Sequence, residues 1–75
     1  MHAKVSRLTR GEYFVVFPIQ NHPHGAIGFK LIGADKQWQL FNHRDTEINC
    51  WTSKRSLIEY LESKTETQLL TLHGA

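Results

Sequence analysis

The sequence predicts an α+β fold, an antiparallel sheet of four to five short strands with one helix, at about residues 53–63, packed on one face. Apolar and β-branched runs recur over the first two thirds of the chain, separated by Gly, Pro, Asn and Asp residues that favour turns. After residue 52 the apolar spacing changes to that of an amphipathic helix. The connections are short, so successive strands are expected to pair antiparallel as a meander.

Size and composition narrow the class of protein. A chain of 75 residues predicts a single domain, 1–75, with a limited core, and a homodimer would add buried surface. With 40% hydrophobic and 21% charged residues, the composition is that of a folded chain. No apolar run is long enough for a membrane span, and residues 1–10 show no apolar leader segment. The lone cysteine, Cys50, then favours a cytoplasmic location.

The first two strands flank a glycine turn. Residues 4–8 form the first expected strand, and the turn at 9–11 ends in Gly11, which tolerates a positive φ. Residues 13–17 are aromatic or β-branched throughout, which predicts a central strand. Pairing should end near Pro18, which has no backbone N–H to donate.

The next three strands follow from turns and alternation. Residues 21–25, NHPHG, form a polar turn, and the apolar positions of 27–31 then alternate as in a half-buried strand. A hairpin loop at 33–36 leads to a strand in which Trp38 and Leu40 share one face. A polar turn at 44–47 precedes a short return strand at 48–51.

The helix has a recognisable start and no clear stop. Thr52 or Ser53 is the expected N-cap, and Arg55 and Glu59 form an outer-face pair four residues apart. Residues 68–73 are interpreted as a last strand. The expected core comprises Val5, Val15, Phe17, Ile27, Phe29, Trp38, Leu40, Ile48, Leu57, Ile58 and Leu61. One helix covers only one face of such a sheet, so the other face meets water, a second copy or a partner.

Metal binding and catalysis find little support. His22, His24, His43 and Cys50 are the conceivable ligands, but their spacing matches no structural zinc motif, so no metal and no cofactor are expected. Cys50 is interpreted as a small buried hydrophobe. A nucleophile needs a base and an orienting group, and no such set is evident; we therefore expect no enzyme.

Nucleic-acid binding is the function that we favour from the sequence. Residues 1–30 carry four basic side chains against the single acid Glu12, whereas residues 31–75 carry five basic and six acidic side chains. Basic groups contact phosphates, and exposed aromatic rings stack on bases. The expected site for DNA or RNA comprises Lys4, Arg7, Arg10, Tyr13 and Lys30.

The alternative is a protein-binding regulator or inhibitor, of the size that mobile elements encode. It would use an aromatic patch of Phe41, Trp51 and Tyr60, or self-association of the open sheet face. No membrane partner is expected. The pI of about 8.9 lies just below the range typical of dedicated nucleic-acid-binding domains, so charge alone does not decide between the two functions.

Overall fold

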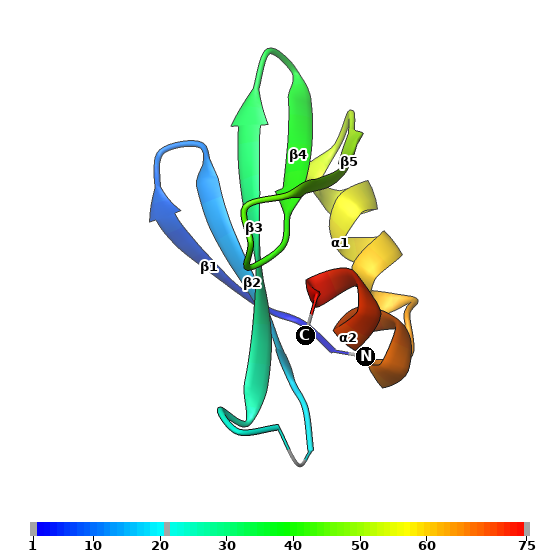
Figure 1. Ribbon diagram of the computed structural model, residues 1–75. Helices are drawn as coiled ribbons and strands as arrows, with labels where there is room; N and C mark the ends of the chain where they lie inside the picture. The colour runs from blue at the N-terminus through cyan, green and yellow to red at the C-terminus, as the bar shows by residue number, and fades with distance from the viewer. Residues whose placement is uncertain (1, 21, 75) are drawn as a thin grey trace.

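A computed structural model describes residues 2–20 and 22–74, which form one five-stranded sheet and two short helices (Figure 1). The elements are β1 Lys4–Thr9, β2 Glu12–Pro18, β3 Ala26–Ala34, β4 Gln37–Phe41, β5 Glu47–Trp51, α1 Lys54–Glu62 and α2 Glu66–His73. The predicted α+β class is thereby confirmed. Neither described helix has the length and apolar content that crossing a bilayer requires.

The sheet is an antiparallel meander with the order β1-β2-β3-β4-β5. The prediction of four to five strands is confirmed with five, and the strand expected to be central, β2, lies inside the sheet. The hairpin from β3 to β4 turns on Asp35 and Lys36, whose φ angles are 50° and 64°. Two successive left-handed residues are the geometry whose twist suits a two-residue hairpin.

The pairing register sorts the strand side chains onto two faces, because side chains alternate along each strand. One face, which we call the core face, holds every buried strand side chain among the described residues: Val15 and Phe17 of β2, Ile27, Phe29 and Leu31 of β3, and Leu40 of β4. The opposite face, which we call the solvent face, holds no buried side chain in the described part of the strands. Its residues include Lys4, Ser6, Glu12, Phe14, Val16, Gly28, Lys30, Ile32, Gln39, Phe41 and Cys50.

Most of the predicted core is confirmed. Buried as expected are Val15, Phe17, Ile27, Phe29, Leu40, Leu57 and Leu61, and Trp38, Ile48 and Ile58 pack against them half-buried. The prediction that Val5 belongs to the core is wrong. Val5 is 41% exposed, because β1 is an edge strand and the helices contact β3, β4 and β5. The prediction omitted Ala3, Ile19, Leu31 and Leu69, all of which are buried.

The first helix follows the sequence signals closely. The Ser53 hydroxyl accepts a hydrogen bond from the Ser56 N–H at 3.1 Å, so Ser53 is the N-cap. On the exposed side, Arg55 Nε lies 3.2 Å from Glu59 Oε1, as the four-residue spacing predicts. The helix ends at Glu62 with Ser63 as its C-cap, within the expected bounds.

The expectation of a single helix followed by a strand at 68–73 is wrong, because this segment is helix α2. Thr65 and Gln68 form a capping box: the Thr65 hydroxyl accepts from the Gln68 N–H at 3.2 Å, and the Gln68 amide oxygen accepts from the Thr65 N–H at 2.9 Å. Gly74, with φ of 82°, closes the other end. Leu69 is fully buried, so α2 belongs to the core.

The burial of Leu69 predicts that α2 is required for stability. Leu69→Ala should lower the free energy of unfolding by about 2–5 kcal/mol, because it leaves a cavity in the core. Leu8→Ala is the matched control, since Leu8 is 54% exposed and its truncation should change stability by less than about 0.5 kcal/mol. Urea denaturation followed by far-UV circular dichroism measures both. Equal midpoints for the two variants would contradict the place of α2 in the core.

Candidate nucleic-acid interface

The five residues of the predicted nucleic-acid site do not share one surface. Lys4 and Lys30 lie on the solvent face, whereas Arg7 pairs with Tyr13 on the core face. Arg10 lies in the turn between β1 and β2. The sequence placed these residues on neighbouring strands, and the alternation of strand side chains divides them between the two faces.

Tyr13 is engaged inside the protein. Its ring lies 5.6 Å from the ring of Trp38, and the ammonium of Lys54 lies 3.8 Å from its centroid. A cation over an aromatic face is a favourable contact, so Tyr13 connects the start of α1 to the sheet. The half-buried ring therefore offers little free face to a base.

The solvent face instead carries a row of two aromatic side chains around one cation. Phe14 of β2 pairs with Lys30 of β3, and Lys30 pairs with Phe41 of β4. Side chains that pair across antiparallel strands have Cβ atoms about 5 Å apart, so each phenylalanine is a direct neighbour of Lys30. Phe14 is 36% exposed, although it is a large apolar side chain. The sequence predicted Tyr13 as the stacking residue, and the structure shows Phe14 in its place on this face. Strand alternation relative to Val15 was the signal that could have identified it.

Gly28 sets the orientation of the Phe14 ring. A Cβ atom built at Gly28 would lie 2.4 Å from Phe14 Cε2 and 2.6 Å from its Cζ, so this edge of the ring occupies the space that a side chain at Gly28 would fill. Only a residue without a side chain permits this close approach. The Phe14 side chain consequently leans across the pair of strands toward Gly28 while 36% of the residue stays exposed.

The loop between β4 and β5 brings an acid beside this row. The Asn42 side-chain oxygen accepts from the backbone N–H groups of Arg44 and Thr46, at 2.9 and 3.1 Å, which fixes the loop. Asp45 has a φ of 57°, in the left-handed region that Asp tolerates better than most residues. Its carboxylate lies 3.7 Å from Lys30 Nζ and keeps 81% of its side chain exposed.

Two histidines complete a cleft next to Phe14. The rings of His43 and His73 stack with centroids 4.3 Å apart, and His43 Nδ1–H donates to the His73 carbonyl oxygen. A cleft of about 280 Å³ opens between Phe14, Gly28 and Lys30 on one side and the loop and α2 on the other: Asn42, His43, Asp45 and His73. Sequence reasoning missed this cleft, because its lining comes from four distant segments.

Burial lowers the pKa of His73. Its Nδ1 is buried with no hydrogen-bond partner among the described residues. Desolvation is the largest cause of the lowered pKa, and repulsion from His43 and then from His22 adds to it.

The conceivable metal ligands do not converge. The His22 and His24 rings lie 5.9 Å apart in the β2–β3 loop, and His43 stacks on His73. Cys50 lies on β5 opposite Gln39 and is exposed, so its interpretation as a buried hydrophobe is wrong: the register turns it to the solvent face. In residues 2–20 and 22–74, no three or more His, Cys, Asp or Glu side chains are grouped to hold a metal ion.

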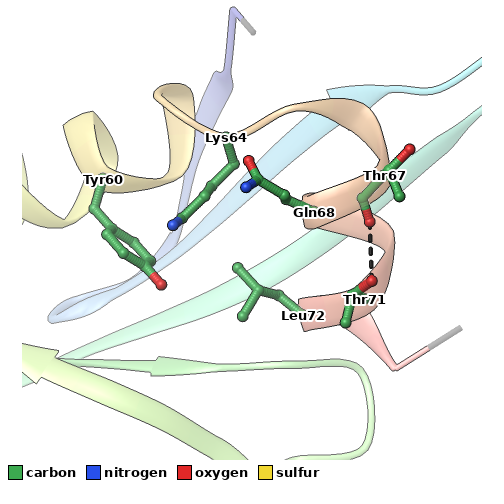
Figure 2. A pocket seen from close by; sticks show the side chains of 6 residues that line it. All are labelled: Tyr60, Lys64, Thr67, Gln68, Thr71 and Leu72. Carbon is green, nitrogen blue, oxygen red and sulfur yellow. Dashed lines mark hydrogen bonds between the residues drawn. The ribbon is translucent and has the colours of Figure 1, made fainter.

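The aromatic residues of the protein-binding alternative also divide between two surfaces. Phe41 lies on the solvent face, while Trp51 and Tyr60 contact each other with ring centroids 5.0 Å apart where β5 meets α1. Beside Tyr60 lies a recess of about 270 Å³, shown in Figure 2. It is lined by Tyr60, Lys64, Thr67, Gln68, Thr71 and Leu72.

Several polar groups of this recess are already engaged. Lys64 Nζ lies 4.4 Å from the Tyr60 ring centroid, toward which it points in Figure 2. The Thr71 hydroxyl donates to the Thr67 carbonyl at 3.0 Å, and the Gln68 oxygen caps α2. These contacts engage the Lys64 ammonium, the Thr71 hydroxyl and the Gln68 amide oxygen within the protein.

Comparison of the chain with protein-family models, with curated proteins and with solved structures finds no match.

The lowered pKa of His73 predicts a loss of stability in acid. Below the unfolded value of about 6.5, the unfolded chain binds a proton that the folded chain resists, so unfolding becomes more favourable as pH falls. As pH falls from about 7.5 to about 5, the Tm of the His73→Gln variant should fall less than that of wild type. The Tm of the His2→Gln variant, which changes an exposed residue, should fall as much as that of wild type. Calorimetry measures the three profiles. A wild-type slope retained in His73→Gln would contradict this origin.

Proposed function

We propose that this chain is a non-enzymatic module that binds single-stranded nucleic acid on its solvent face. The observation that carries the proposal is the row Phe14–Lys30–Phe41, in which a lysine of β3 pairs with a phenylalanine on each neighbouring strand. Aromatic rings stack on unpaired bases, and a cation beside them neutralises the linking phosphates.

The accessibility of this face supports the proposal. The buried leucines of the helices, Leu57, Leu61 and Leu69, join the core with the core-face side chains of the strands. We infer that α1 and α2 cover the core face and leave the solvent face to a partner. Phe14 and Phe41 lie two strands apart, about 10 Å, so a strand crossing the sheet would place separate, unstacked bases on them. Bases paired in a duplex would not reach the rings.

The distribution of charged side chains suggests the path of the bound nucleic-acid strand across the sheet. Lys4 lies on the solvent face at the β1 edge, and Arg10 lies in the β1–β2 turn. The opposite edge carries Glu47, which pairs with Phe41. Phosphates are expected to follow the basic β1–β3 side, where counterion release favours binding.

The alternative of a protein-binding regulator or inhibitor has weaker support, since Phe41, Trp51 and Tyr60 do not form one patch. Self-association through the solvent face would compete with nucleic acid for Phe14 and Phe41. A dimer that dissociates when an oligonucleotide is added would fit the proposed function, whereas a dimer that an oligonucleotide leaves unchanged would favour the alternative. Sedimentation with and without an oligonucleotide distinguishes them.

Two adjacent residues on opposite faces test the stacking. Phe14→Leu should weaken binding to a labelled single-stranded oligonucleotide by about tenfold or more, because a stacked base is worth about 1–3 kcal/mol. Tyr13→Leu, which disturbs the contact with Lys54 instead, should reduce stability and leave the affinity of the folded protein close to wild type. Fluorescence anisotropy measures affinity. A larger loss of affinity in Tyr13→Leu than in Phe14→Leu would indicate that Tyr13 is the stacking residue and that the site lies on the core face.

The two lysines of the solvent face test the phosphate contacts. Lys4→Gln combined with Lys30→Gln should reduce the salt dependence of log Kd by about 1.4, since each contact with a single strand contributes about 0.7. Lys36→Gln in the exposed β3–β4 turn is the control and should leave the slope unchanged.

The remaining basic residues of the sequence prediction are tested in the same titrations. Arg7→Glu with Arg10→Glu should weaken binding less than the lysine pair does, because Arg7 lies on the core face. A larger loss of affinity for the arginine pair, with no change in the salt dependence of log Kd for the lysine pair, would place the bound nucleic acid away from the solvent face.

A further inference from the structure

We propose that the cleft beside Phe14 holds one guanine base of the bound strand, recognised by Asp45 and Lys30. This inference rests on the proposed function and deepens it. The cleft of about 280 Å³ is below the range of about 300–1,000 Å³ typical of sites for drug-sized ligands, which suits a single base.

The cleft has a stacking surface and a hydrogen-bonding edge. Phe14 lines the cleft beside Gly28 and is 36% exposed, so a base that enters the cleft meets an aromatic ring on which it can stack. Beside it, the Asp45 carboxylate and the Lys30 ammonium lie 3.7 Å apart. The site therefore presents two acceptor oxygens directly next to a donor.

Guanine matches this order of groups. Its Watson–Crick edge carries the N2 amino group and the N1–H, two adjacent donors that a carboxylate accepts together, followed by the O6 acceptor. One of the three N–H donors of the Lys30 ammonium satisfies O6, which leaves the others for a neighbouring phosphate. Adenine and cytosine each offer one donor next to a ring-nitrogen acceptor, which would face the carboxylate lone pair to lone pair. Thymine and uracil place their single N–H between two carbonyls. Guanine alone among the common bases gives the carboxylate two donors.

The loop holds Asp45 in place before the base arrives. Asn42 accepts two backbone hydrogen bonds within the loop, and the Asp45 N–H donates to the Asn42 carbonyl at 3.0 Å. Asp45 is 81% exposed and makes its ion pair with Lys30, which is itself 37% exposed. Exchange of this weak surface pair for hydrogen bonds to a base costs little, and the loop backbone, already held by these hydrogen bonds, loses little freedom on binding.

The test measures how tightly the wild-type protein binds different bases, presented in DNA, in RNA or as a free nucleotide. The probes are labelled oligothymidine with one central guanine, inosine or adenine, the corresponding oligouridine RNAs, and free GMP as a competitor. The guanine oligonucleotide should bind about tenfold or more tighter than the adenine one, as expected for a bidentate contact. Inosine, which lacks the N2 amino group, should lie between the two. A higher affinity of either the DNA or the RNA series identifies the natural source of the strand.

Asp45→Asn is the decisive variant. Asparagine tolerates the left-handed backbone but replaces one acceptor by a donor, so the preference for guanine over adenine should fall to about one while binding of oligothymidine persists. Asp35→Asn is the matched control: it removes the same charge at another left-handed residue, in the β3–β4 turn, and should retain the preference. Far-UV circular dichroism checks that both variants fold.

The outcomes separate this inference from the proposed function. Equal affinity for all bases, or a guanine preference that survives Asp45→Asn, would overturn the guanine cleft and leave strand binding standing. Free GMP that competes as well as the guanine oligonucleotide would support the cleft and overturn strand binding. Absence of binding to every probe would overturn both.

Discussion

The antiparallel register between β2 and β3 is the constraint on which the rest of the structure depends. It pairs Val15 with Phe29 on the core face and, one residue away, Phe14 with Lys30 on the solvent face. A slip of one residue would exchange the faces, bringing a lysine into the core and exposing the phenylalanine that anchors it. The same pairing thus fixes both the apolar core and the aromatic–cation row, so stability and the proposed binding surface are set together.

The β4–β5 loop and the end of α2 extend this surface beyond the sheet. β4 ends at Phe41, opposite Lys30. From residue 29 toward its start, the edge of β3 that faces away from β2 therefore has no strand beside it among the described residues. Asp45 comes within reach of Lys30 near this edge, and the His73 ring lies 5.7 Å from that of Phe29. The short fourth strand therefore leaves the space in which the cleft forms.

Local signals predicted the strands, and the errors came from one overlooked local signal and from long-range packing. Turn residues and alternation were sufficient for the meander, since hairpins are local. The segment at 68–73 was misassigned because consecutive leucines suit a strand as well as a helix, and the capping box at Thr65 was overlooked. The exposure of Val5 and Cys50 follows from sheet-edge position and register. Basic residues were recognised, but which of them share a face with Phe14, and that Asp45 meets Lys30, depend on tertiary structure.

Both glycines within β3 lie beneath aromatic rings, one on each face. Gly28 lies under Phe14 on the solvent face, and a Cβ at Gly33 would lie 2.8 Å from Trp38 Cη2 on the core face. A side chain at either position must displace the ring above it. Over evolutionary time the two members of each pair are therefore expected to change together: homologues that replace the glycine should also carry a smaller residue in place of the ring. Such covariation would reveal the strand register from an alignment alone, with no coordinates.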